Sequence, residues 1–417
     1  MRAWTPVAVP ALPPSRDVPD QVQVWDTKTQ TLRRVGPRSG EATLYVCGIT
    51  PYDATHLGHA FTYLTFDLLQ RVWIDTGLTV RYAQNITDID DPLLERADGT
   101  GVDWRELAAS QIDLFREDMT ALRVLPPQHY VAATDAMELV ESVLVRLQKS
   151  GLLYRVEDPG FRDWYFRTAH DAYFGAVSHL DYAEQLAQFA AKGGDPDREG
   201  KKERLDALMW RLERPGEPSW ASRFGQGRPG WHVECTAIAQ HYLAGTVSVQ
   251  GGGADLAFPH HEMCASIGRA ANDGNPFAEA YVHVGMVGLE GQKMSKSLGN
   301  LELVSRLRAK GVAAPVIRLA LLAHHYRHDW EWFATDIGTA QRRADAWEAA
   351  FRASRGTQAA PMIAGLRRAM RTDLDSPKAL TIVDEWVSAV LAGDGDDVSA
   401  PAQVAAAVDA LLGISFD

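Results

Sequence analysis

A cysteine and two histidines lie close together near residue 50 of the chain. Cys47 precedes a short turn that contains glycine and proline, and His56 and His59 follow that turn in the sequence HLGH. A neutral imidazole can donate a hydrogen bond to a phosphate oxygen without carrying a permanent charge, and a thiolate is a soft ligand for a metal ion. Taken singly, these residues are more simply explained as ordinary histidines and an inert buried thiol. Together they indicate nucleotide chemistry near a metal.

Two lysines form a second candidate group. Lys293 and Lys296 lie in the sequence KMSKS, which has glycines on both sides. Two ammonium groups on a loop usually face solvent and have no further role. A loop of this kind can also neutralise the charge that builds up on a departing pyrophosphate. The sequence of this loop alone is compatible with a solvent-exposed loop and with a loop that binds pyrophosphate.

A third group combines cysteine and histidine in the pattern that zinc prefers. Cys47, Cys235 and the histidines of the sequence FPHHE supply thiolate and imidazole, and three protein ligands would leave one position open for a substrate. A substrate sulfur would bind there as its thiolate, whereas serine lacks the soft sulfur and would be rejected. Cys264 lies one helical turn after His260 and is either a fourth ligand or a small core residue. We expect three ligands.

The elements around these residues predict an α/β fold. Residues 44–59 have the pattern of a buried strand, a tight turn and the start of a helix, so backbone N–H groups and a positive helix end point to one place. A second strand is predicted at 79–86, and it ends in the sequence TDIDD. Strands that alternate with helices predict a parallel sheet covered by helices. Carboxylates at a strand end lie at the edge of such a sheet where ligands bind.

The chain divides into five predicted parts. They are an N-terminal arm and hairpin (1–43), the first half of a catalytic domain (44–125), an inserted α+β subdomain (126–205), the second half of the catalytic domain (206–300) and a C-terminal helical domain (301–417). Within the insertion, Thr134 is predicted to cap a helix. The main sheet is predicted to resume around Trp210 and to include one strand at 281–288.

The net charge, the lengths of the apolar stretches and the number of cysteines restrict the class of protein. A net charge of −12 over 417 residues disfavours non-specific binding to nucleic acid or to an anionic membrane. No stretch reaches the roughly 20 apolar residues of a membrane span, and the proline-rich N-terminus lacks the apolar core of a signal peptide. Three cysteines make a poor disulfide framework. We therefore expect a cytoplasmic protein, and we expect it to be a monomer.

A set of motifs between residues 44 and 300 resembles the cysteinyl-tRNA synthetases of class I. They occur in one order as CGITPYD, HLGH, TDIDD, GEPSW, GRPGWH, GGGADLAFPHHE and KMSKSLGN. The chain departs from that family where Cys264 replaces a glutamate ligand, and the part after Ser297 is short for a synthetase with an anticodon-binding module. From Leu374 onward Lys378 is the only basic residue, against eight acidic ones. Such a surface would repel RNA.

With these departures, the chain is similar to the cysteine:glucosaminyl-inositol ligases of mycothiol biosynthesis, which are class I synthetase relatives. The resemblance implies a Rossmann-like catalytic domain, one Zn²⁺ per chain, and ATP as a substrate with Mg²⁺. It implies that L-cysteine is activated as its adenylate and that the amine of glucosaminyl-inositol takes the place of the tRNA hydroxyl, so no nucleic acid is expected. The alternatives are a truncated cysteinyl-tRNA synthetase and a non-catalytic zinc-binding module.

The resemblance also implies roles for single residues. His56 and His59 would hold the triphosphate, and Lys293 and Lys296 would neutralise pyrophosphate. The metal ligands would be Cys47, Cys235 and His260. The adenylate pocket would be lined by Cys47, Gly48, Ile49, Thr50, Thr62, Asn85, Ile86, Thr87, Trp231, Gly253, Ala254, Asp255 and Val287. Core packing remains an alternative for Trp231, and a helix N-cap remains one for Asp255.

Overall fold

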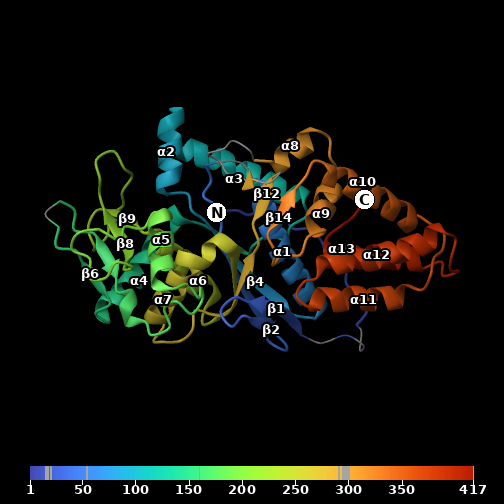
Figure 1. Ribbon diagram of the computed structural model, residues 1–417, viewed down its shortest axis with the longest axis horizontal. Helices are drawn as coiled ribbons and strands as arrows, with labels where there is room; N and C mark the ends of the chain where they lie inside the picture. Colours follow the sequence, from blue (N-terminus) through green and yellow to red (C-terminus); the bar gives the residue numbers. More distant parts are fainter. Residues whose placement is uncertain are drawn as a thin grey trace.

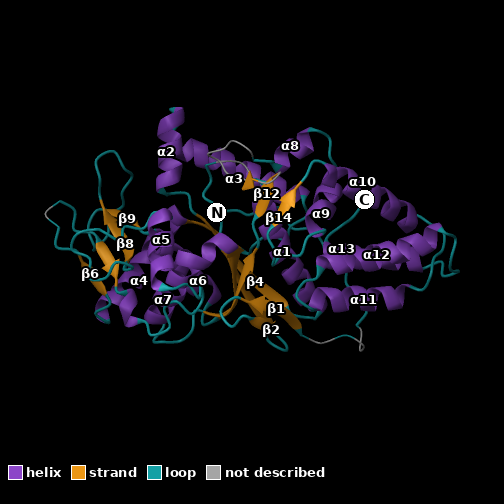
Figure 2. Cartoon of the chain, viewed as in Figure 1, coloured by secondary structure: helices purple, strands orange, loops and turns teal. Residues whose placement is uncertain are grey.

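The computed structural model of the chain describes residues 1–14, 18, 21–52, 55–158, 160–289, 292–293 and 301–416, with the backbone alone at 292–293. The described elements form an elongated molecule with the C-terminal helices at one end and a smaller sheet at the other (Figure 1). The central sheet lies between these two ends (Figure 2).

The central sheet has five parallel strands. They are β3 (Glu41–Val46), β4 (Thr79–Ile86), β5 (His129–Ala132), β10 (Val247–Gly253) and β11 (Ala278–Val284), in the order β11-β10-β3-β4-β5. Leu44 of β3 is opposite Tyr82 on one side and Val249 on the other. The parallel sheet expected from the alternation of strands and helices is therefore present.

Two helices cover opposite faces of this sheet. Leu44 and Val46 share a core cluster with α1 (Leu57–Asp75), whereas Tyr45 and Cys47 share another with α6 (Trp231–Leu243). This division follows from the strand period of two, which directs successive side chains to opposite faces. The sheet is buried on both sides, as its apolar strands require. Helices α2 (Asp91–Thr100), α3 (Trp104–Ala121) and α7 (Glu262–Ala271) complete this part of the chain.

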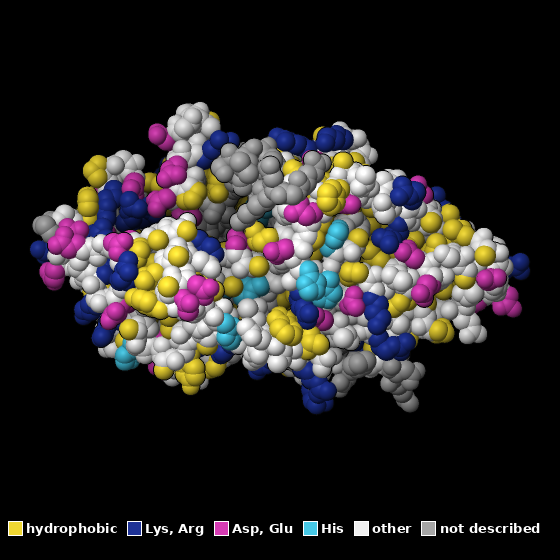
Figure 3. Space-filling model, in the orientation of Figure 1, with side chains coloured by type: hydrophobic (Ala, Val, Ile, Leu, Met, Phe, Trp, Pro, Cys, Tyr) yellow, Lys and Arg dark blue, Asp and Glu magenta, His cyan; other side chains and the backbone are white. Residues whose placement is uncertain are grey.

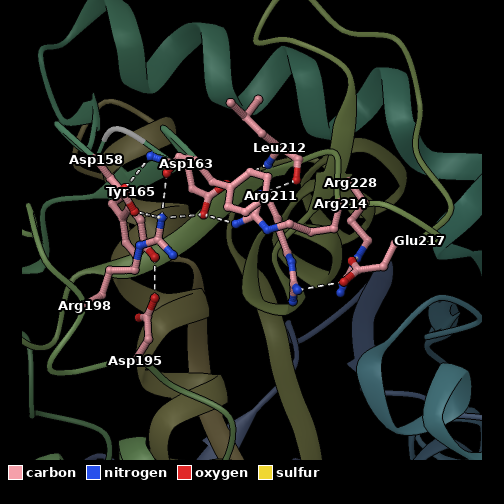
Figure 4. Close-up of polar contacts among 12 residues, drawn as sticks. Asp158, Asp163, Tyr165, Asp195, Arg198, Arg211, Leu212, Arg214, Glu217 and Arg228 are labelled. Carbon is pink, nitrogen blue, oxygen red and sulfur yellow. Dashed lines mark hydrogen bonds and ion pairs between the residues drawn. The ribbon is translucent and has the colours of Figure 1, made fainter.

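A second sheet is antiparallel and lies beside the first. It consists of β6 (Leu153–Arg155), β7 (Trp164–Phe166), β8 (Ala207–Leu212) and β9 (Gly227–Pro229), with helices α4 (Met137–Lys149) and α5 (Tyr182–Ala191) and 3-10 turns at Ala133–Ala136 and Thr168–His170. Asp163 and the arginines near it fasten the loop between β8 and β9 to this sheet (Figure 4).

Three predictions about this region are wrong. β5 belongs to the central sheet, so the insertion does not begin at residue 126, and Trp210 lies in β8 of the antiparallel sheet, so it does not end at 205. Short strands have the same local pattern in either sheet, and only their distant partners distinguish them. Thr134 does not cap α4, because it lies in the 3-10 turn and donates to Asp88 instead. The remaining division of the chain stays a prediction.

The N-terminal segment is irregular and then forms the expected hairpin. β1 (Val22–Asp26) pairs with β2 (Thr31–Val35) in antiparallel register. Ahead of it, Trp4 is buried, and its indole N–H donates to the carbonyl of Val124 at 2.7 Å. The arm is therefore held on the surface by one aromatic anchor.

The strand predicted at 281–288 is divided in two. β11 ends at Val284, and β12 (Val287–Leu289) forms a separate sheet with β13 (Gln292–Lys293) and β14 (Trp330–Trp332). Gly285 makes the break possible, because a Cβ at this position would lie 2.3 Å from the carbonyl oxygen of His328.

The C-terminal part is mostly helical, as predicted, but β14 interrupts it as a short strand that was not predicted. It contains α8 (Val304–Ala309), α9 (Ala314–Leu322), α10 (Thr335–Phe351), α11 (Ala359–Arg371), α12 (Ser376–Leu391) and α13 (Ala400–Leu412). Its contact with α1 includes a buried ion cluster of Asp67, Arg71 and Arg318. Among the helices that the structure describes, none combines the length and the apolar character that crossing a bilayer requires.

Candidate active site

The carboxyl ends of β3 and β10 mark the switch point of the strand order, which in open parallel sheets borders a crevice. In the sheet, β4 and β5 lie in sequence order on one side of β3, and β10 and β11 lie on its other side. Ligands of open parallel sheets bind where the strand order reverses in this way. Cys47 lies at this point directly after β3, and its backbone N–H donates to the carbonyl of Gly251 at 3.1 Å.

The two histidines of HLGH lie at the start of α1. His56 is the N-cap residue, its Nδ1 accepts from the backbone N–H of His59 at 3.4 Å, and the two rings stack with centroids 3.7 Å apart. Both side chains are half-buried. One turn later the hydroxyl of Thr62 donates to the carbonyl of Gly58. The strand, turn and helix are thus arranged as predicted, with two imidazoles at a helix N-terminus.

The segment after β3 is fastened to the end of β4. The N–H of Gly48 donates to Oδ1 of Asn85 at 2.8 Å, and the Asn85 amide donates to the Thr87 hydroxyl at 3.0 Å. A Cβ on Gly48 would lie 1.6 Å from the carbonyl oxygen of Asn85, so no larger residue fits here. Asn85, Ile86 and Thr87 are buried. Their side chains therefore fix the position of Cys47 and its neighbours.

The predicted metal ligands come together. Among the described residues, the Sγ atoms of Cys47 and Cys235 and a ring nitrogen of His260 lie within 4.8 Å of one another, and all three side chains are buried. Cys47 follows β3, Cys235 is in the second turn of α6, and His260 lies in the helical turn Ala257–His261 that leads into α7. Trp231 stacks on His260 with ring centroids 4.2 Å apart and is half-buried. It therefore forms a wall beside the group.

Cys264 lies next to this group and outside it. Its Sγ is 3.8 Å from Nε2 of His260 and donates toward the carbonyl of His232 at 3.5 Å. The other ring nitrogen of His260 lies 3.0 Å from Nδ1 of His232. The geometry agrees with three ligands and with Cys264 as a small buried residue behind His260.

The charges in the group suit a metal. Burial raises the pKa of the Cys47 thiol, whereas the hydrogen bond from Cys47 and the charge of His260 outweigh burial and lower the pKa of Cys235. For His260, burial favours the neutral ring, but the neighbouring thiol groups raise its pKa overall. A cation bound by this group would displace the protons of the thiols and of the imidazole, because zinc binds them in their deprotonated forms. Two soft sulfurs and one imidazole fit zinc in particular.

Several buried or half-buried polar residues near this group were not identified from the sequence. They are Asp90, His232, Glu234, His261 and His283. Burial raises the pKa of Asp90 to about 6 and also raises that of Glu234, whose Oε2 has no hydrogen-bond partner among the described residues. Asp90, His232 and His261 lie inside the quoted motifs, and Glu234 and His261 directly adjoin the predicted ligands Cys235 and His260. Their positions in the motifs and next to predicted ligands were the signal by which these residues could have been found.

The remaining predicted site residues are placed as follows. Ala254 and Asp255 are exposed and Gly253 is half-buried, all at the end of β10, and Val287 is buried in β12. Asp255 lies within the 3-10 turn Ala254–Leu256, which has no side-chain cap, so it is not an N-cap. Lys293 of β13 pairs through its backbone with Gly288 of β12. Lys296 lies outside the described residues.

The loop between β8 and β9 is held close to the site by charge. Glu217 accepts hydrogen bonds from Arg211 at 2.8 Å and from Arg228 at 3.2 Å (Figure 4). Arg228 also pairs with Asp91 at the start of α2. Since Arg228 precedes Trp231 by three residues, this pairing fixes the entry to α6 and with it the wall beside His260.

Comparison with known proteins identifies the family. A family model described as the tRNA synthetases class I (C) catalytic domain matches residues 35–342. The chain belongs to this family. Two relatives match this chain over the full length of both proteins. It is 56% identical to the L-cysteine:1D-myo-inositol 2-amino-2-deoxy-alpha-D-glucopyranoside ligase of Thermomonospora curvata over 100% of both chains, and 53% identical to the ligase of the same name from Kribbella flavida, also over 100% of both.

Solved class I synthetases share the fold at low identity. The Mycobacterium tuberculosis methionyl-tRNA synthetase in complex with methionyl-adenylate matches with a TM-score of 0.60 at 16% identity and covers 89% of each chain. The agnB2 LeuRS of Agrobacterium radiobacter K84 matches with a TM-score of 0.65 at 12% identity and covers 91% of this chain and 84% of its own. The predicted fold class is therefore confirmed.

Proposed function

We propose that this class I synthetase chain is an ATP-dependent ligase that joins L-cysteine to the amine of 1D-myo-inositol 2-amino-2-deoxy-alpha-D-glucopyranoside. Relatives named for this reaction match over the full length of the chain at more than half identity. The single structural observation that supports the proposal is the buried group of Cys47, Cys235 and His260 in the crevice of the sheet. A soft metal held there would recognise a substrate by its sulfur.

The first step forms an adenylate. The cysteine carboxylate attacks the α-phosphorus of ATP, the bond to the β-phosphate oxygen breaks, and pyrophosphate leaves. His56 and His59 bind the phosphates at the N-terminus of α1, where the helix dipole also favours negative charge. Lys293 and Lys296 neutralise the leaving pyrophosphate, and Mg²⁺ accompanies the nucleotide.

The three ligand residues provide selectivity. Zinc bound by Cys47, Cys235 and His260 would supply a Lewis acid that holds the substrate thiolate. Trp231, stacked on His260, and the fixed Cys47–Thr50 segment enclose the small side chain and exclude water. Serine offers a hard oxygen in place of the sulfur and so loses the main attraction.

The second step forms an amide. The free amine of the glucosaminyl-inositol attacks the adenylate carbonyl, the acyl–phosphate bond breaks, and AMP leaves. The acceptor is a small molecule, which agrees with the surface, since basic and acidic side chains are interspersed on the face shown in Figure 3. A polynucleotide partner would require a continuous basic stripe. The monomeric state and the cytoplasmic location remain predictions from the sequence.

An acceptor comparison tests the proposal. The purified chain is given ATP and cysteine, and AMP release is followed with glucosaminyl-inositol or with cysteine-specific tRNA as acceptor. We expect release only with the amino sugar. Transfer to the tRNA alone would establish the truncated synthetase instead. Failure of cysteine to promote exchange of pyrophosphate into ATP would exclude both enzymes and leave the non-catalytic module.

A further inference from the structure

A row of three side chains connects the N-terminal hairpin to the sulfur of Cys47. Sγ of Cys47 lies 3.2 Å from Nε2 of His261, Nδ1 of His261 lies 2.8 Å from Nε2 of His283, and Nδ1 of His283 lies 2.7 Å from the hydroxyl of Thr27. Every nitrogen of both imidazoles is therefore used within this row. Neither His261, His283 nor Thr27 has a part in the reaction proposed above.

The row is held rigidly at both ends. Gly252 of β10 leaves room for His261, because a Cβ there would lie 3.0 Å from Cε1 of the imidazole. At the other end, the N–H of Thr27 donates to the carbonyl of Tyr281 at 2.8 Å, and Asp26 accepts from the N–H of Tyr281 at 2.9 Å. The hairpin turn is thus fixed to β11 two residues before His283.

The direction of the hydrogen bonds follows from the chemistry of the sulfur. A metal-bound thiolate has no proton, so Nε2 of His261 must be the donor toward Cys47. The neutral ring of His261 then accepts at Nδ1, which requires Nε2 of His283 to donate. His283 in turn accepts at Nδ1 from the hydroxyl of Thr27.

We propose that Thr27, His283 and His261 form a directional hydrogen-bond chain that ends on the Cys47 thiolate and sets how strongly this ligand donates to the metal. The inference rests on the zinc site of the proposed function. A hydrogen bond stabilises the sulfur lone pair, which lowers electron donation to the metal and leaves the metal a stronger acid toward the substrate thiol. His283 and Thr27 are thus positioning residues, far apart in sequence from the ligand that they influence.

Metal binding to the substrate-free protein tests the chain directly. Zn²⁺ affinity is measured by competition with a chelator, and Co²⁺ replaces Zn²⁺ to give a thiolate-to-metal absorption band. In His283→Leu the ring of His261 loses the donor that orients it. We expect an absorption band shifted to lower energy, since the sulfur lone pair rises. We also expect a Zn²⁺ affinity about tenfold lower, because the unoriented ring of His261 no longer holds Cys47 in position for the metal. Thr27→Val should shift both in the same direction by less.

Conservative variants separate this role from simple packing. His283→Gln keeps a donor where Nε2 lies, and Thr27→Ser keeps the hydroxyl, so both should restore the wild-type band. His179→Leu is the matched control, because Nε2 of His179 contacts the carbonyl oxygens of Thr27 and Lys28 at 3.1 and 2.9 Å without belonging to the row. It should leave the band unchanged.

The outcomes are distinguishable. An unshifted band and unchanged affinity in His283→Leu would overturn the inference, and so would equal losses in His283→Leu and His283→Gln. If the wild-type chain bound neither ion, the inference and the zinc site would both fail. Cysteine-dependent exchange of pyrophosphate into ATP by that metal-free chain would still leave the ligase proposal standing.

Discussion

Two buried polar clusters border helix α1, and they differ in how completely they are satisfied. In the first, at the sheet crevice, Cys47, Cys235 and His260 converge on one point. In the second, Asp67 accepts hydrogen bonds from Arg71 and Arg318, which both lie fully inside the protein. The second cluster also uses the carbonyl groups at the end of α13 as acceptors.

This difference indicates which of the two clusters has a purely structural role. Around Asp67 each donor has an acceptor, and the charges of Arg318 and Arg71 outweigh burial and lower the pKa of the carboxyl. Such a cluster fastens the C-terminal helices to α1 and has nothing left to offer a ligand. The first cluster instead brings three metal-binding donors to one point, and Oε2 of the neighbouring Glu234 has no hydrogen-bond partner among the described residues. It therefore still has groups to offer a ligand.

The largest effect is expected from Cys235→Ala, which removes one of the converging donors. The variant should lose bound zinc and cysteine-dependent exchange of pyrophosphate into ATP together, with activity falling by at least about 100-fold because the carboxylate is no longer positioned. Metal analysis and the exchange assay measure the two losses. Wild-type turnover in a metal-free variant would make this cluster as structural as the second.

Asp67→Ala should act on stability instead. Removing the carboxylate leaves two buried guanidinium groups without their counter-charge, and we expect a loss of about 3–5 kcal/mol in the free energy of unfolding. Denaturant titration measures it. The control is Asp113→Ala, because Asp113 pairs with Arg116 at the exposed surface and should cost less than about 1 kcal/mol. Similar losses in both variants would remove the distinction between buried and surface pairs.

Lys296→Ala affects neither cluster and should separate binding from chemistry. We expect adenylate formation to slow by about 100-fold, since the lysine acts on charge that develops on pyrophosphate, while cysteine binding changes little. Single-turnover measurements give both quantities. Lys149→Ala, an exposed lysine on α4, serves as the control. Equal losses in rate and affinity would mean that Lys296 is only a binding contact.

Much of the fold and the ligand set could be predicted because the signals are local. The strand predicted at 79–86 is β4, which has the same bounds in the structure. The three predicted metal ligands carry their chemistry in residue type, so their positions in the motifs were sufficient to propose them. In the folded chain the donor atoms of these three residues lie close together.

Other features depend on distant partners and could not be predicted. β5 and β8 are short strands whose sheet is decided by pairing, and their local patterns are alike. His283 lies in an ordinary apolar strand, and its contact with Thr27 joins residues 256 positions apart. Neither residue stands in a recognisable motif. The second coordination sphere of a site is therefore harder to predict from sequence than its ligands.

A second buried aspartate sharpens the comparison through the sign of its pH dependence. Asp118 on α3 accepts from Arg308 at 2.7 Å with one oxygen, and its other oxygen has no hydrogen-bond partner among the described residues. Burial exceeds the effect of Arg308 and raises the pKa to about 6. Because the folded protein binds this proton more tightly than the unfolded chain, Asp118 lowers stability as the pH rises from about 4 to 6.

Asp118→Asn should therefore stabilise the protein at pH 7.5 by about 1–2 kcal/mol, allowing for partial solvent screening, and should change little at pH 4.5. Asp67→Asn should do the reverse, with its cost complete above pH 5 and shrinking as the pH falls below about 4, because the pKa of Asp67 is lowered. Unfolding of both variants and the wild type across this range measures the differences. Parallel curves for the two variants would show that hydrogen-bond satisfaction does not decide which buried carboxylate stabilises this fold.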